Sequence, residues 1–425
     1  MTVLIFFVTL FFLLFIGIPI GLCLAGCAMV MMYTLGNVNM TLIAQTLVEG
    51  SNNLSLMAIP FFMLAGELMS NGGLSKRIVD FSNVIVGRFR GGLGYVAVIA
   101  SIIFAGLSGS AVADTAALGG ILLPLMARQG YNQARSTGLV CSGAIIAPII
   151  PPSIPMILLG TSVGLSVTKM FMSGLVPGLI LGVALMIVWF FIVRKDGYQD
   201  IMHYSFKDGI KLIWQSIPAL ILPVIIVVGI RMGVTTPTEA GVLAVIYAVF
   251  ASKFIYKELT WKGFVTSLEA SASSTATVML IVGCASAAAW MLTVAQLPAQ
   301  MASMLSGLIS HPNLLMLLIN VFLFVVGMIL DIVPNILIFG PILLPIIQAA
   351  GINEYYFALI MVLNLAIGQI TPPVGTVLYV GSSVSRMPFH KVCVAILPFL
   401  AVEIAVLLLL TYVPALVLVP LGWLT

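Results

Sequence analysis

The sequence has very little charge for its length. Only 7% of its 425 residues are Asp, Glu, Lys or Arg, whereas about 25% is usual for a soluble domain. A soluble protein covers its surface with polar groups, and so few charged side chains cannot cover a chain of this size. The scarcity excludes an ordinary soluble fold and favours a surface that mostly faces lipid. The 17 basic residues are dispersed among apolar segments, which argues against a nucleic-acid partner.

The sequence also lacks the residue patterns of enzymes and metal centres. It has no Walker A loop, no Gly-x-Ser-x-Gly motif and no metal-binding His-Glu pair, so we expect no ATP hydrolysis or other enzyme chemistry. Its five cysteines show no zinc-ligand spacing, and we interpret them as packing residues. The N-terminus lacks the basic region and short apolar core of a signal peptide, which predicts a retained first span.

Hydrophobic residues make up 61% of the chain, in runs of about 20 residues, the length that crosses a bilayer as a helix. We predict nine crossings: Val3–Tyr33, Leu54–Ser70, Gln133–Val163, Lys169–Val193, Trp214–Met232, Glu239–Phe254, Ala270–Thr293, Glu354–Ser383 and Lys391–Leu418. Two further apolar regions, 94–127 and 314–350, are too long for one span and carry polar residues at their centres. We predict that both are re-entrant helical hairpins.

The distribution of basic residues supports this topology. With nine crossings and two hairpins, 15 of the 17 Lys and Arg residues fall on one side of the membrane. Only Lys169 and Arg231 fall on the other side. Because cytoplasmic loops carry the excess of Lys and Arg, we expect a cytoplasmic N-terminus and a periplasmic C-terminus.

The chain contains an internal repeat. Ile121-Leu122-Leu123-Pro124 recurs as Ile342-Leu343-Leu344-Pro345, a shift of 221 positions, and Pro151-Pro152 recurs as Pro372-Pro373 in the same register. Five crossings separate equivalent points, so the copies would be inverted in the membrane, as in many secondary transporters. We divide the chain into a first repeat (1–193), a cytoplasmic loop with a connecting helix (194–232) and a second repeat (233–425).

Two amphipathic connectors, Asn39–Gly50 and Thr260–Ser271, are also paired by this shift. They are interpreted either as helical arms at the membrane interface or as ordinary loops.

Each repeat contains a proline-rich break inside a predicted span. Pro151-Pro152 interrupts the helix over 133–163, and Pro372-Pro373 interrupts the helix over 354–383. Proline removes a helical N–H and clashes with the preceding turn, so the helix breaks and frees carbonyl oxygens. These oxygens must face protein or a polar cavity, because lipid cannot satisfy them. Two purely structural kinks are the alternative.

Freed carbonyls beside hydroxyl-rich hairpin tips match the oxygen ligands that hard cations such as sodium prefer. The candidate sodium ligands are Ser108, Ser110, Ala147, Ile150, Pro152, Asp331, Gly368, Thr371, Pro373 and Thr376. The tips also expose helix N-termini, which attract anions. A carboxylate substrate is therefore expected between the tips, with candidate contacts at Ser110, Asp114, Ser153 and Asn335.

Acidic residues inside a membrane are costly and point to function. Asp331 is the strongest candidate for ion or substrate handling, whereas Asp114 is equally explained as a helix cap. Glu67 and Glu239 are interpreted as helix-end residues. Glu403 lies deep in the last span, and the sequence leaves open whether it pairs with another subunit or inside the bundle.

Several motifs, taken in order, resemble the large permease subunit (DctM type) of TRAP (tripartite ATP-independent periplasmic) transporters. They are Pro60-Phe61-Phe62-Met63-Leu64-Ala65-Gly66-Glu67, Gly72-Gly73-Leu74, Ser108-Gly109-Ser110-Ala111-Val112-Ala113-Asp114, Pro148-Ile149-Ile150-Pro151-Pro152-Ser153, Thr236-Pro237-Thr238-Glu239-Ala240 and Ile370-Thr371-Pro372-Pro373-Val374-Gly375. The resemblance implies an all-α membrane protein with an elevator mechanism, in which a domain holding both hairpins and broken helices slides against a scaffold. It also implies a bacterial inner-membrane location.

The resemblance further implies sodium-driven uptake of a small organic acid, together with a small membrane subunit and a periplasmic solute-binding protein. The short start at Met1 shows no fused small subunit. The motifs are similar to those of the 2,3-diketo-L-gulonate branch. Trp290–Ala295 lacks the basic residue of sialic-acid members, which makes that substrate less favoured. The alternatives are a stand-alone sodium/dicarboxylate symporter of the divalent-anion type, and a channel or membrane scaffold.

Overall fold

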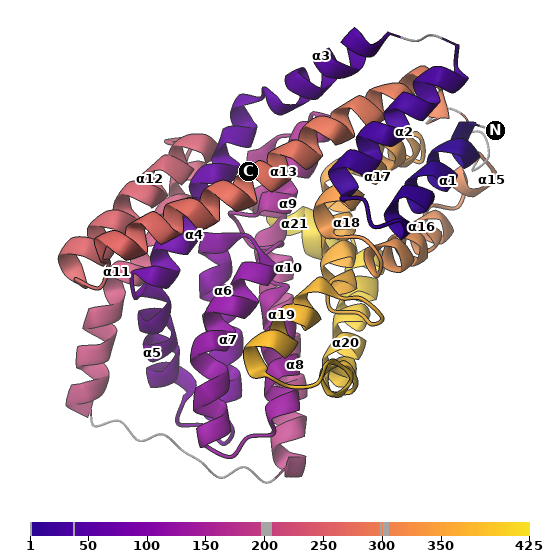
Figure 1. Cartoon of the computed structure of the whole chain (residues 1–425). Helices are drawn as coiled ribbons and strands as arrows, with labels where there is room; N and C mark the ends of the chain where they lie inside the picture. The colour runs from indigo at the N-terminus through magenta and orange to yellow at the C-terminus, as the bar shows by residue number, and fades with distance from the viewer. Residues whose placement is uncertain (1, 37–38, 197–205, 298–299, 301–305) are drawn as a thin grey trace.

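The computed structural model describes residues 2–36, 39–196, 206–297, 300 and 306–425. Throughout this described part the regular secondary structure is helical (Figure 1). The first half of the chain forms α1 (Thr2–Phe15), α2 (Ile20–Thr34), α3 (Met40–Ser51), η1 (Leu54–Met57), α4 (Ala58–Asn71), α5 (Leu74–Val86), α6 (Gly92–Ser108), α7 (Ala111–Arg128), α8 (Gln133–Ala144), α9 (Ile154–Val163) and α10 (Val167–Asp196).

The second half forms a matching series of helices. They are α11 (Phe206–Arg231), α12 (Pro237–Phe250), η2 (Ala251–Ile255), α13 (Trp261–Val294), α15 (Ser306–Ile309), α16 (Pro312–Gly327), α17 (Ile332–Ala349), α18 (Glu354–Gly368), α19 (Thr376–Ser385), α20 (Phe389–Tyr412) and α21 (Ala415–Leu424). Adding 221 to the bounds of α7 gives those of α17, and α8 and α18 begin at positions related by the same shift.

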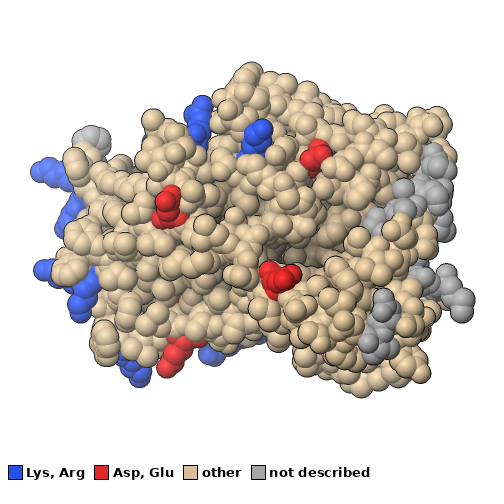
Figure 2. Space-filling view, turned by 90° about the horizontal axis from the view of Figure 1, so that it is seen from above, with Lys and Arg blue, Asp and Glu red and all other residues tan. Residues whose placement is uncertain are grey.

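The surface is apolar in the way that a membrane protein requires. Among the described residues, eight helices are long and apolar enough to cross a bilayer. Large side chains such as Phe191, Trp214 and Val224 are exposed on the outer helices α10 and α11. Figure 2 shows one face of the molecule on which charged side chains are sparse and Lys and Arg gather towards one edge. Such a surface favours contact with lipid over most of its area.

The predicted helix breaks and hairpins are present in the described structure. α6 and α7 are joined by Gly109 and Ser110, and α16 and α17 by residues 328–331. α8 ends at Ala144 and α9 begins only at Ile154, while α18 ends at Gly368 and α19 begins at Thr376. Whether the hairpins re-enter the same side of a membrane stays a prediction.

The first predicted crossing, Val3–Tyr33, is wrong as a single helix. The chain turns at Gly17, whose φ of 90° suits glycine, and α2 then begins after Pro19. α2 folds back on α1, so that the Cys27 thiol lies 3.8 Å from the Phe6 carbonyl oxygen. The last predicted crossing is also divided, because α20 ends at Tyr412 and α21 follows Pro414.

Both amphipathic connectors are helical, so the interpretation as ordinary loops is wrong. Asn39–Gly50 forms α3, and Thr260–Ser271 forms the first part of α13. The Ser51 hydroxyl of α3 donates to the carbonyl oxygen of Met279 in α13 at 3.5 Å. In turn, the Ser267 hydroxyl near the start of α13 donates to the Glu67 carbonyl of α4 at 3.4 Å.

These two contacts are reciprocal. The 221-residue shift places α3 on residues 261–272 and α4 on residues 279–292, both within α13. Each connector therefore packs on the spanning helix of the other repeat, as expected for a two-fold, self-complementary contact.

Candidate functional site

The two hairpin tips and the two helix breaks meet around one cavity of about 390 Å³. Its lining comes from α4, both tips, both breaks and α13. The lining residues are Met63, Gly109, Ser110, Ala111, Val112, Pro148, Ile154, Pro155, Ser273, Ser274, Thr277, Val278, Asp331, Ile332, Val333 and Gln369. We call this space the tip cavity.

The tip cavity is lined by equivalent positions of the two repeats. Ser110 and Asp331 differ by 221 positions, and so do Pro148 and Gln369. The neighbours of Ser110 and Asp331, at 111–112 and 332–333, also line the cavity in matching pairs. The repeats therefore contribute related segments to one polar space.

The first tip is held by hydrogen bonds that involve the buried acid Asp114. The Ser108 hydroxyl donates to a carboxylate oxygen of Asp114 and accepts from the Ser110 backbone N–H at 3.2 Å. Ser110 caps α7 by accepting from the Ala113 N–H at 3.4 Å. Asp114 is fully buried and lines neither described cavity of the tip region. The structure therefore places Ser110 at the cavity and Asp114 beneath it.

The first helix break packs directly against the backbone of the first tip. Gly109 has a φ of 62°, and a Cβ atom there would lie 2.5 Å from the Pro152 carbonyl oxygen. The Ser153 hydroxyl donates to the Pro148 carbonyl and accepts from the Met156 N–H at 3.2 Å, which caps α9. Ser153 is thus fully buried, engaged with the backbone and absent from the lining of the tip cavity.

Carbonyl oxygens remain available at both breaks. In the described part of the chain, no backbone N–H donates to the carbonyls of Ala147, Ile150, Pro152, Thr371 or Pro373. The Gly368 carbonyl differs, because it accepts from the Thr371 N–H at 3.0 Å. The Thr371 hydroxyl, within the break, donates back to the Ile367 carbonyl of α18, and the Thr376 hydroxyl has no described partner. Uncommitted backbone oxygens are ligands that a hard cation accepts.

The second tip carries the charge of the site. Asp331 precedes α17 but makes no capping hydrogen bond. Instead its carboxylate accepts from the Gln369 side-chain amide at 2.6 Å, which joins the tip to the second break. Asn335 is fully buried, and its amide donates to the Leu330 carbonyl at 3.0 Å. Asn335 therefore holds the tip rather than lining the tip cavity.

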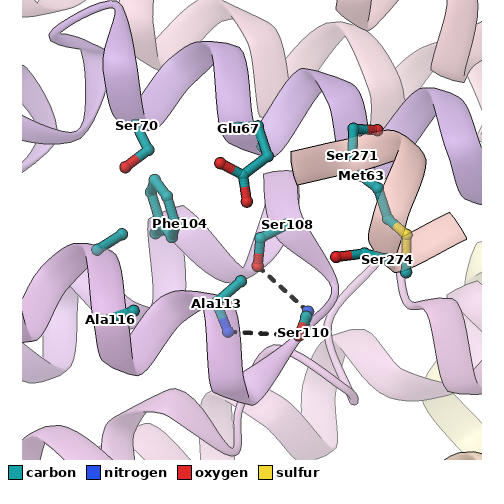
Figure 3. Close-up of a pocket in the computed structure, with 12 residues that line it drawn as sticks. Met63, Glu67, Ser70, Phe104, Ser108, Ser110, Ala113, Ala116, Ser271 and Ser274 are labelled. Carbon is teal, nitrogen blue, oxygen red and sulfur yellow. Dashed lines mark hydrogen bonds between the residues drawn. The ribbon is translucent and has the colours of Figure 1, made fainter. Parts of the chain in front are cut away.

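A second cavity of about 270 Å³ adjoins the first (Figure 3). The two cavities share Met63, Ser110 and Ser274. In Figure 3 the Glu67 carboxylate points towards Ser108, and Ser271 and Ser274 of α13 face them across the space. Glu67, interpreted from the sequence as a helix-end residue, therefore lines a polar cavity.

Sequence reasoning missed three contributors to these cavities. They are Gln369, the hydroxyl residues of α13 and Glu67. Five hydroxyl residues occur between Ser271 and Thr277, inside an otherwise apolar span. That cluster was the available signal, because unpaired hydroxyls are uncommon in contact with lipid. For Glu67 the available signal was its place inside the predicted span Leu54–Ser70, because an acid inside a membrane points to function.

The fold and the cavity together define an all-helical, multi-pass membrane protein with a polar site enclosed by broken helices and hairpin tips. Among the described residues no cluster of His, Cys, Asp and Glu resembles a transition-metal centre. Comparison with known proteins then places the chain within this class.

The family described as "Tripartite ATP-independent periplasmic transporter, DctM component" matches residues 7–416, and the chain belongs to this family. It is 44% identical to the 2,3-diketo-L-gulonate TRAP transporter large permease protein YiaN of Escherichia coli, over 100% of both chains. It is 38% identical to the C4-dicarboxylate TRAP transporter large permease protein DctM of Pseudomonas aeruginosa, over 95% of this chain and 94% of that protein.

Among solved structures, the Alcanivorax borkumensis YdaH transporter, described as having an unusual topology, is similar in fold. Its TM-score is 0.61 at 14% identity, over 90% of this chain and 88% of that one. Membership of the DctM family and the relatives named above identify the chain as a large permease subunit of a TRAP transporter.

Proposed function

We propose that this permease subunit drives uptake of a small organic acid with a sodium gradient, in the bacterial inner membrane. It acts with a small membrane subunit and receives the acid from a periplasmic solute-binding protein. The observation that carries the proposal is the tip cavity, where Ser110 and Asp331 occupy equivalent positions of two repeats. The family and its named relatives support the tripartite assembly.

Sodium is proposed to bind where uncommitted oxygens gather at each break. In the first repeat these are the carbonyls of Ala147, Ile150 and Pro152, of which the Pro152 carbonyl lies against Gly109, between Ser108 and Ser110 in the chain. In the second they are the carbonyls of Thr371 and Pro373, with Thr376 nearby in the chain and Asp331 joined to this break through its hydrogen bond with Gln369. Gly368 is the weakest candidate, because its carbonyl already accepts a hydrogen bond.

The anionic substrate is proposed to bind in the tip cavity itself. The first residues of α7 and α17 line this cavity. Helix N-termini favour negative charge. No Lys or Arg lines the cavity, so bound sodium would offset the charges of Asp331 and of the substrate. Two relatives are named as transporters of 2,3-diketo-L-gulonate and of C4-dicarboxylates. A small carboxylate of this kind is therefore the proposed cargo.

Movement is proposed to be of the elevator type. The tips and breaks form the mobile part, and α3, α4, α11, α12 and α13 form the scaffold. The reciprocal contacts between α3, α13 and α4 support a scaffold held across both repeats. The tip cavity supports the division, because α4 and α13 line one side and the tips and breaks line the rest.

Reconstitution tests the coupling and the tripartite assembly together. Proteoliposomes containing this chain and its small subunit should accumulate radiolabelled 2,3-diketo-L-gulonate or succinate when the matching binding protein and external sodium are present. Replacing sodium with choline should abolish accumulation, and unchanged accumulation would refute sodium coupling. Equal uptake without any binding protein would instead favour the stand-alone symporter.

The fold-back of α1 and α2 changes the proposed orientation of the N-terminus. The cytoplasmic assignment assumed an odd number of crossings before Thr34, and two antiparallel helices remove that premise. With the same distribution of basic residues, we propose that both termini face the periplasm. Thr2→Cys should react with an impermeant maleimide added outside the cell. Arg88→Cys should react only from the cytoplasmic side. Labelling of Thr2→Cys from the cytoplasmic side alone would support a cytoplasmic N-terminus instead.

A further inference from the structure

Glu403 is a buried acid that the proposed transport site does not use. It lies in the middle of α20 and is fully shielded from solvent. Neither of its carboxylate oxygens has a hydrogen-bond partner among the described residues. An ionised carboxylate left unpaired in an apolar interior is strongly unfavourable, so the group must be neutralised.

No described basic side chain supplies that neutralisation. The salt bridge between Arg77 and Glu258 lies in another part of the fold. On the helices that pack against α20, the charged groups have other contacts: Lys169 lies over the Tyr355 ring, Arg194 lies over the Phe190 ring, and Glu354 accepts from Gln348. The remaining ionisable groups on the neighbouring helices are Arg135 and Cys141 on α8, Lys195 and Asp196 on α10, Tyr355 and Tyr356 on α18, and Tyr379 on α19. Those on α20 itself are His390, Lys391, Cys393 and Tyr412.

Two of these helices place specific side chains around Glu403. Cys141 and Ser142, both buried on α8, interact with the Glu403 carboxyl. The Ser142 hydroxyl has no hydrogen-bond partner among the described residues. α8 and α20 approach closely about one turn away from Ser142, since a Cβ at Gly138 would lie 3.3 Å from the Ala395 carbonyl oxygen. The Ser142 hydroxyl of α8 therefore lies beside the Glu403 carboxyl of α20, and neither group has another hydrogen-bond partner among the described residues.

This cluster adjoins both broken helices. Ser142 lies two residues before the end of α8, directly ahead of the first break. The Cys141 thiol donates to the Val377 carbonyl at 3.7 Å, in the first turn of α19 after the second break. A change of charge at Glu403 would therefore act on the two segments whose carbonyls are the proposed cation ligands.

A proton fits this site better than a metal cation. Sodium needs several oxygens, and helices α8 and α20 already use most of their carbonyls internally. A proton needs one acceptor oxygen and converts the carboxylate into a neutral group that can donate to Ser142.

We propose that Glu403 is a proton-binding site, in which one carboxylate oxygen takes up a proton and holds it beside Ser142 at the α8–α20 contact. The proton comes from water when the contact opens and returns to water when it opens again, so no other bond forms or breaks. The site goes beyond sodium-coupled uptake and does not depend on it. Its consequence is that movement of the broken helices is linked to protonation.

Infrared difference spectroscopy on the purified chain in lipid nanodiscs tests the occupant. A protonated carboxyl gives a C=O stretching band that a carboxylate lacks. The wild type should show such a band that disappears in Glu403→Gln and persists in the matched control Asp114→Asn. A spectrum unchanged by Glu403→Gln would overturn the proposal. So would a Glu403 band that appears only after sodium is removed, because the occupant would then be sodium.

The pH dependence of uptake tests the link to movement, at constant sodium. Wild-type uptake should fall about tenfold per pH unit once the pH exceeds the titration point of a single proton site. Glu403→Gln, a neutral group of the same shape, should lose this component. Identical pH profiles would overturn the link. If Glu403→Gln does not fold, Ser142→Ala should shift the wild-type profile, and an unshifted profile would overturn it equally.

Discussion

The two hairpin tips occupy equivalent positions of the repeats but differ in chemistry. Ser110 and Asp331 both stand at the N-terminus of a tip helix and both line the tip cavity. Ser110 uses its side chain to cap α7, whereas Asp331 leaves α17 uncapped and binds Gln369 across the cavity. The two residues occupy the same position of the repeat, but only Asp331 in the second repeat carries a carboxylate. The first tip therefore contributes shape, and the second contributes the negative charge that a cation site needs.

The two helix breaks differ in the solvent exposure of their prolines. Pro151 and Pro152 are buried, whereas Pro372 is half-buried and Pro373 is exposed. Beneath the tips, Asp114 and Asn335 are again equivalent positions, and both are fully buried and fasten their tip. The prolines of the first break are thus shielded from solvent and those of the second are not, so the two breaks differ in solvent access although both tips line the same cavity.

The largest expected effect concerns the charge that distinguishes the tips. Asp331→Asn keeps the side-chain shape but removes the negative charge, and we expect uptake to fall about 100-fold, equivalent to about 3 kcal/mol. Ser110→Ala, at the equivalent position, removes a neutral hydroxyl and should cost about tenfold or less. Sodium-dependent uptake by both variants measures the difference. Equal losses would show that the tips do not divide their roles in this way.

The close contact of the first tip with its break gives the next effect. Gly109→Ala places a methyl group against the Pro152 carbonyl in a backbone conformation that favours glycine. We expect a loss of about 2 kcal/mol in stability, and a corresponding drop in the yield of monodisperse protein. Leu330 holds the equivalent position of the second repeat, so Leu330→Ala is the matched control and should be milder. A Gly109→Ala protein of normal stability would contradict the close contact between the first tip and the first break.

Removing the buried hydrogen bonds of Asp114 and Asn335 should change the rate of amide hydrogen exchange separately at each tip. Asp114→Ala removes the acceptor of Ser108, and Asn335→Ala removes the donor to Leu330. Each lost buried hydrogen bond costs about 1–2 kcal/mol, so amides at the affected tip should exchange about tenfold faster. Each variant should affect its own tip. Faster exchange at both tips from either change would mean that the tips open together.

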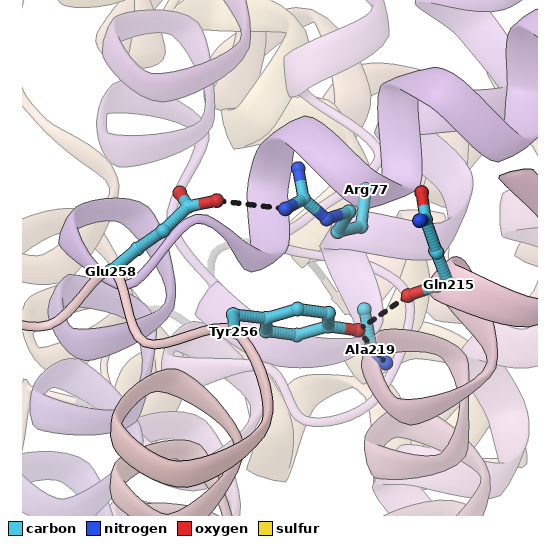
Figure 4. Close-up of polar contacts among 5 residues, drawn as sticks. All are labelled: Arg77, Gln215, Ala219, Tyr256 and Glu258. Atoms are coloured by element: carbon cyan, nitrogen blue, oxygen red, sulfur yellow. Dashed lines mark hydrogen bonds and ion pairs between the residues drawn. The ribbon is translucent and has the colours of Figure 1, made fainter.

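The smallest effect is expected far from both tips, in the cluster of Figure 4. The Tyr256 hydroxyl donates to the Gln215 carbonyl at 2.9 Å and accepts from the Ala219 N–H at 3.1 Å, next to Pro218 in α11. Burial raises the pKa of Tyr256 to about 12, so the hydroxyl keeps its proton and its donor role throughout any transport assay.

Tyr256→Phe removes both hydrogen bonds but keeps the ring beneath Arg77, 5.1 Å from the guanidinium carbon. We expect a loss of about 1 kcal/mol, visible as a lower thermal midpoint, with uptake within twofold of the wild type. A large loss of uptake at unchanged thermal stability would give this cluster a part in transport and weaken the contrast with the tips.

Local sequence signals predicted the breaks, the hairpins and the register of the repeats. Proline interrupts a helix wherever it stands in the interior, and apolar runs of spanning length form helices because lipid leaves the backbone no other partner. The same rules failed in the first run of residues. Gly17 and Pro19 marked a turn there, but the apolar composition continued through it and concealed two helices.

Sequence alone determined that this is a helical membrane protein with two related halves and interrupted spans, because those properties follow from backbone chemistry read locally. Only the tertiary structure decided which groups meet. The pairing of Asp331 with Gln369, the entry of Glu67 into a cavity and the isolation of Glu403 beside Ser142 each join segments distant in the chain. Such contacts depend on how the helices pack, and no short-range pattern encodes them.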